Sequence, residues 1–104
     1  MSTERLEWFG GPGHFCASYS CRYHLHTHVN GRFCVSTVGA YHPRDAAKME
    51  TVGCDRYYET MVFPLTDDGG VDDWSGLTMR GYQTSEEADV GHLAVVVEYQ
   101  EKAK

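Results

Sequence analysis

Three histidines lie two residues apart, at positions 24, 26 and 28 of the segment RYHLHTHV. Successive side chains of a β-strand point to opposite faces, so on a strand His24, His26 and His28 share one face. Alternate imidazoles of this kind can converge on a metal ion such as zinc. The chemistry that the pattern offers is metal binding, and the competing interpretation is a solvated or interface strand face.

The residues around this segment favour the second interpretation. Cupin barrels bind metal through a His-x-His pair, but they add a glutamate shortly after the pair and a later histidine behind a Pro-x-Gly turn, and this chain has neither. We therefore predict that the protein has no cofactor, and keep zinc on the histidine strand as the alternative.

The chain contains four cysteines, which are Cys16, Cys21, Cys34 and Cys54. Structural zinc sites usually show two close ligand pairs, whereas only one loose pair is found here, with His14 as a further candidate ligand. A catalytic cysteine would need a base, for which His14 and His92 are candidates, but no local motif marks a nucleophile. We expect the cysteines to be small apolar residues of the interior.

An acidic loop follows at TDDGGVDDWSG, positions 66–76. It lacks the alternating carboxylates and terminal glutamate of an EF-hand, so a solvated turn is expected. Trp74 follows Asp72 and Asp73, and an aromatic anchor beside carboxylates is typical of an interaction hot spot for a basic partner. Trp74, Asp72 and Asp73 are therefore candidate binding residues, together with the three histidines.

The histidine strand is predicted to belong to a hairpin, with strands at 22–29 and 32–39. Asn30-Gly31 is the strongest short hairpin signal, because both residues tolerate the positive φ of a type I′ turn. This turn places Val29 opposite Arg32 and divides the hairpin into two faces. The histidines occupy the outer face, and the predicted core face holds Tyr23, Leu25, Thr27, Val29, Cys34, Ser36 and Val38.

A third strand of the sheet is predicted at 57–64, closed by Pro64, and 76–82 is a candidate for a further short strand. A helix is predicted over 85–101, because Thr84 begins a capping box and acidic residues fill the first turn. One face of this helix carries Ala88, His92, Val95, Val96 and Tyr99. The predicted fold is α+β: an antiparallel sheet with one C-terminal helix on one face, in a single domain of residues 1–104 with a loosely docked arm at 1–12.

The composition restricts the classes of partner. Nine Lys and Arg against fifteen Asp and Glu give a formal net charge of −6. An acidic chain is a poor binder of nucleic-acid phosphates and suits a basic protein partner. No apolar run approaches the ~20 residues of a membrane helix, and the N-terminus lacks the apolar core of a signal peptide. We expect a cytoplasmic protein whose cysteines are thiols.

Several short phrases together suggest a relationship: GHF at 13–15, Cys21 before the hairpin, VSTVG at 35–39, YETMVF at 58–63, GY at 81–82 and GH at 91–92. The set resembles a family of small, functionally uncharacterised proteins encoded by tailed bacteriophages and prophages. The resemblance implies a phage accessory protein made in the host cytoplasm, and it brings no catalytic residues. It implies that a shared site would use His14, Cys21, Tyr82 or His92.

Three functions follow from these observations. We favour a non-enzymatic protein that binds a host or phage protein, with counter-defence as one such role, because no catalytic motif is present and the chain is acidic. The alternatives are a metal-binding domain or metalloenzyme that uses the histidine strand, and a structural module that self-associates into a homo-oligomer through the hairpin.

Overall fold

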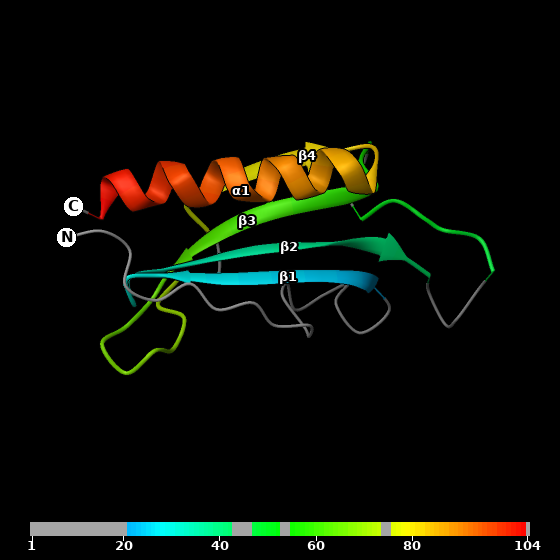
Figure 1. Cartoon of the computed structure of the whole chain (residues 1–104). Coiled ribbons are helices and arrows are strands. Elements are labelled where there is room, and N and C mark those ends of the chain that lie inside the picture. The colour runs from blue at the N-terminus through cyan, green and yellow to red at the C-terminus, as the bar shows by residue number, and fades with distance from the viewer. Residues whose placement is uncertain (1–20, 43–46, 53–54, 74–75, 104) are drawn as a thin grey trace.

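The computed structural model describes residues 21–42, 47–52, 55–73 and 76–103 of the chain. Within these ranges the elements follow in the order β1 (Cys21–Val29), β2 (Phe33–Tyr41), β3 (Tyr58–Pro64), β4 (Thr78–Tyr82) and α1 (Ser85–Lys102). The strands form one antiparallel sheet in sequence order, and α1 lies along one face of it (Figure 1). The predicted α+β fold is confirmed, whereas the predicted arm at 1–12 lies outside the described residues.

The hairpin turn forms where it was predicted, but the register of the two strands differs by one residue. Asn30 and Gly31 have φ values of 54° and 67°, and the Arg32 N–H donates to the Val29 carbonyl at 2.9 Å. Arg32 then remains in the loop, so Val29 pairs with Phe33. The predicted pairing of Val29 with Arg32 is wrong, because the loop has three residues, and the Arg32 guanidinium turns to the Ala103 carbonyl at 3.4 Å.

This shift exchanges the two faces of β2, since side chains alternate along a strand. Val35 and Thr37 share a face with Val29, and Cys34, Ser36 and Val38 share the opposite face with the histidines. The assignment of these last three residues to the face beneath the helix is therefore wrong. They are nevertheless buried, as is Val29, whereas Leu25 is only half-buried and the expectation of a fully buried Leu25 is also wrong.

The helix begins as its sequence predicts. The Thr84 hydroxyl accepts a hydrogen bond from the Glu87 N–H at 3.1 Å, and the Glu87 carboxylate accepts one from the Gln83 N–H at 2.9 Å. The first bond satisfies a backbone donor that the first turn leaves without a helical partner, and the second ties the residue before the N-cap to the helix. The buried residues of α1 are those of the predicted face, namely Ala88, His92, Val95, Val96 and Tyr99.

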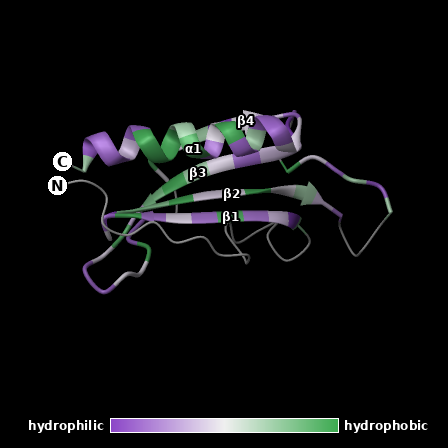
Figure 2. Ribbon diagram, in the orientation of Figure 1, coloured by the Kyte–Doolittle hydropathy of each residue, from purple (hydrophilic) through white to green (hydrophobic). Residues whose placement is uncertain are grey.

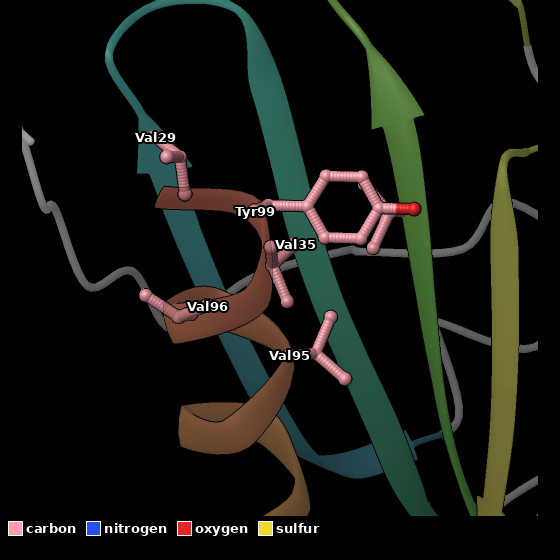
Figure 3. Close-up of a cluster of buried hydrophobic side chains, with 6 residues drawn as sticks. Val29, Val35, Val95, Val96 and Tyr99 are labelled. Atoms are coloured by element: carbon pink, nitrogen blue, oxygen red, sulfur yellow. The ribbon is translucent and has the colours of Figure 1, made fainter. Parts of the chain in front are cut away.

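The apolar core lies between the C-terminal half of α1 and the part of the sheet next to the β1–β2 turn. Val95, Val96 and Tyr99 of the helix pack on Val29, Val35 and Val62 of three neighbouring strands (Figure 3). The Tyr99 ring meets the Phe33 ring edge-on, with the centroids 4.9 Å apart, and its hydroxyl hydrogen-bonds the Thr78 hydroxyl of β4. One aromatic residue thus ties the helix to strands on both sides of the core.

The described residues contain no helix that is both long enough and apolar enough to cross a membrane. Hydrophobic residues are concentrated in the middle turns of α1, while hydrophilic residues mark its C-terminal end (Figure 2). The middle turns of α1 are apolar on the exposed side as well as on the side that faces the sheet.

Candidate functional site

The three histidines share the sheet face that points away from α1, as predicted. His24 lies opposite Val38, His26 opposite Ser36 and His28 opposite Cys34. All three are half-buried, and the His24 Nε2 donates to the Cys21 carbonyl at 2.5 Å. Within the described ranges, no three His, Cys, Asp or Glu residues are grouped so that they could hold a metal ion. The geometry therefore gives the zinc alternative no support, and the absence of a cofactor stays a prediction.

The two described cysteines are buried in the interior. Cys34 lies on the histidine face, and burial raises the pKa of its thiol to about 11. A thiol with such a pKa is protonated at neutral pH and is a poor nucleophile. Cys21 is also buried, which agrees with the expected role of both as small apolar residues. The other candidates for cysteine chemistry, His14, Cys16 and Cys54, lie outside the described residues.

The side chain of His92 is fully buried between α1 and the sheet, at the centre of a polar network. Its Nε2 lies 2.7 Å from the Thr27 hydroxyl and its Nδ1 lies 2.6 Å from the Thr37 hydroxyl. The Thr37 hydroxyl is in turn 2.5 Å from that of Thr60. The network joins α1 to β1, β2 and β3, and it satisfies the buried polar atoms of the ring.

This environment keeps the imidazole neutral. Burial lowers the pKa of His92 to about 4, and the nearby His26 acts in the same direction, whereas Asp89 acts against them. Both ring nitrogens already have threonine partners, so the ring is built into the fold and no nitrogen is directed at solvent. The sequence analysis placed His92 on the buried helix face and Thr27 on the core face of the hairpin, but it did not place Thr37 or Thr60 beside His92. A threonine on a strand carries no local signal that distinguishes a buried hydrogen-bond partner from an exposed residue.

The phrases that carry the phage resemblance meet on this side of the sheet. A Cβ at Gly91 would lie 2.2 Å from the Tyr82 ring, so the Gly-Tyr segment at 81–82 packs against the Gly-His segment at 91–92. A Cβ at Gly39 would lie 2.1 Å from the Tyr58 ring, so VSTVG and YETMVF also touch. Because these glycines have no Cβ, the tyrosine rings can pack directly on the backbone. The residues that carry the resemblance therefore lie where the helix and strands pack together. The resemblance locates no reactive group.

The N-terminal end of α1 is held to the sheet edge by Tyr23. Its hydroxyl donates to the Asp89 carboxylate at 2.5 Å, and its ring meets the Tyr58 ring edge-on at 5.2 Å. Burial and the bond to Asp89 together raise the pKa of the Tyr23 phenol above its ordinary value. Asp89 is thus occupied by a structural contact.

The acidic loop forms the expected turn. The Thr66 hydroxyl donates to the Asp68 carboxylate, and the Gly69 N–H donates to the Thr66 carbonyl at 2.9 Å. The bond from Thr66 lowers the pKa of Asp68. Asp72 and Asp73 are exposed, as a docking role requires, but Trp74 lies outside the described residues. The binding role of the loop stays a prediction.

An apolar stripe that the sequence analysis missed lies on α1. Val90, Leu93 and Val97 are 70%, 51% and 56% exposed. Their spacing of three and four residues places them on one side of the helix, away from the five buried residues. The exposed glutamates Glu86 and Glu101 lie four residues beyond the two ends of this triplet. The spacing of these three residues is present in the sequence, but the prediction of one amphipathic face accounts only for the buried side.

Two exposed apolar residues lie elsewhere, at Leu77 and Met79, which are 52% and 51% exposed. Met79 pairs with Met61 in the sheet, on the histidine face, and so lies on the opposite side of the sheet from α1. Its exposed fraction equals that of Leu93, which makes it a matched control for the stripe on the helix.

Comparison of the chain with protein-family models, with curated proteins and with solved structures finds no match. In the described residues the structure places the imidazole of His92 and the thiol of Cys34 inside the fold, and places an apolar triplet between carboxylates on the surface. The arrangement is suited to binding a protein surface.

Proposed function

We propose that this chain is a non-enzymatic binding protein that docks on another protein through the outward side of α1. The single observation that carries this proposal is the exposure of Val90, Leu93 and Val97 on one side of a helix whose other side is already buried. A helix that is apolar on two sides is typically covered on both, and contiguous exposed apolar residues mark interaction sites.

The resemblance to phage and prophage proteins supplies the setting for this proposal. In that setting the protein is an accessory factor in the cytoplasm of the host cell and acts by capturing a host or phage protein, with counter-defence as one such role. The absence of a catalytic motif in the sequence and the buried, hydrogen-bonded state of His92 support binding over catalysis.

The test is capture of a partner from a bacterial host lysate by the purified chain. The variant Leu93→Gln/Val97→Gln removes most of the apolar area of the stripe, whereas Met79→Gln removes a residue of equal exposure from the other side of the sheet. We expect the double variant to lose the captured protein and the control to keep it. Both should melt within a few degrees of the wild type, since exposed substitutions change stability little.

Capture that survives the double variant would overturn the proposal for this surface. The acidic loop would then be tested by Trp74→Ala, which should abolish capture with little change in melting temperature if Trp74 is the anchor.

A further inference from the structure

We infer that the partner of this surface presents a basic amphipathic helix. The inference depends on the proposed function and adds the chemistry of the partner. It concerns five positions of α1, here called the outer stripe: Glu86, Val90, Leu93, Val97 and Glu101.

The spacing of the outer stripe suits a helix as its occupant. Its three apolar residues repeat at three and four residues, which is the repeat that lets two helices pack side by side along a straight seam. The stripe from Glu86 to Glu101 spans ~22 Å at the rise of an α-helix, or about four turns of a partner helix. A partner helix with apolar residues at the same intervals would cover all three.

The charge around the stripe selects a basic occupant. Glu86 and Glu101 are exposed at its two ends, and Glu87 is exposed beside it. Of the described cations on this part of the helix and the neighbouring strand, the Lys102 ammonium lies over the Tyr99 ring at 5.7 Å and Arg80 lies 3.3 Å from Glu98. With a net charge of −6 over the chain, the stripe attracts lysine and arginine and repels acidic surfaces.

A second copy of the chain is a poorer occupant. In a symmetric antiparallel pair, Val90 of one copy would face Val97 of the other, and the apolar contact would be satisfied. The same symmetry would place Glu86 of each copy against Glu101 of the other. Like charges would meet at both ends, whereas a partner helix with a lysine or arginine at each end would form ion pairs there.

The test uses synthetic helical peptides and the intact chain. The basic peptide carries leucines at i, i+3 and i+7, with a lysine four residues before the first leucine and another four residues after the last. A second peptide has glutamates in place of those lysines, and a third has the basic composition in scrambled order. Binding is measured by fluorescence anisotropy at low and at physiological salt, and the mass of the free chain by analytical ultracentrifugation.

We expect the basic peptide to bind the wild type at least roughly tenfold more tightly than the acidic or scrambled peptide, with weaker binding at higher salt. Leu93→Gln should weaken binding by roughly tenfold, whereas Met79→Gln should leave it unchanged. The charge-reversed variant Glu86→Lys/Glu101→Lys should prefer the acidic peptide. This reversal of preference is a readout that a merely unfolded variant could not produce.

Two results would overturn the inference. One is equal binding of the basic and acidic peptides, and the other is a dimer of the free chain that Leu93→Gln dissociates, which would make a second copy the occupant. If lysate capture still depends on Leu93 and Val97 while the basic peptide fails, the proposed function stands and only the chemistry of the partner is wrong. If lysate capture does not depend on them, the proposed function fails whatever the peptides do.

Discussion

The two sides of α1 differ in how far their apolar residues are buried. The inner side of α1 buries four apolar residues and one histidine whose two nitrogens are both hydrogen-bonded. The outer side exposes three apolar residues between glutamates. The pattern of a single amphipathic face explains the inner side. It does not explain why the outer side of the isolated fold is apolar. The inner side holds the helix on the sheet, and the outer side carries the proposed binding surface.

The largest contrast should appear between neighbours on the two sides. His92→Ala leaves a cavity and removes a partner from the hydroxyls of Thr27 and Thr37, so it should lower the free energy of unfolding by about 3–5 kcal/mol. Leu93→Ala removes a side chain that is half exposed and should cost less than ~0.5 kcal/mol. Urea unfolding of both variants measures the difference. A comparable cost for the two would contradict the division into inner and outer sides.

The pH dependence of stability should follow from His92. Its pKa falls from 6.5 in the unfolded chain to about 4 in the fold, so the unfolded state binds the proton more readily. Stability is therefore complete above the unfolded pKa and decreases as the pH falls, by about 2 kcal/mol between pH 7 and pH 5. The variant His92→Gln should lose this part of the pH dependence while it retains the part due to other groups. Identical slopes for the variant and the wild type would show that His92 is protonated as easily in the fold as outside it.

A smaller effect is expected where α1 touches Tyr82. Gly91→Ala would normally stabilise a helix by about 1 kcal/mol, but here its Cβ meets the Tyr82 ring, and the crowding should make the change destabilising by about 1–2 kcal/mol. In a Tyr82→Ala background the same change should become stabilising. A double-mutant cycle measures this change of sign. Additive effects would mean that the ring moves aside without cost.

Much of the fold followed from local sequence signals. Asn30-Gly31 located the turn, Thr84 located the start of the helix, and the spacing from Ala88 to Tyr99 identified the buried face, because each depends on interactions within a few residues. The register of the hairpin could not be predicted in this way. Whether Arg32 belongs to the loop or to β2 depends on which face of β2 packs under Val95 and Tyr99. That choice is made by contacts between distant segments.

The candidate site was harder to predict for the same reason. The histidine strand and the acidic loop attracted attention as unusual residue types, yet the described contacts give the histidines no metal site. The outer stripe contains only valine, leucine and glutamate, and its meaning depends on knowing that the opposite side of α1 is already occupied. Only the packing of the sheet supplies that knowledge.

We propose that the outer side of α1 binds a partner while the inner side keeps its packing on the sheet. NMR of the chain with labelled valine and leucine methyl groups, titrated with the basic helical peptide, separates the two sides residue by residue. We expect the methyl signals of Val90, Leu93 and Val97 to shift together and saturate, while those of Val35, Val62 and Val95 stay in place. Shifts that cluster on the inner residues, or that spare the outer three while others respond, would contradict it.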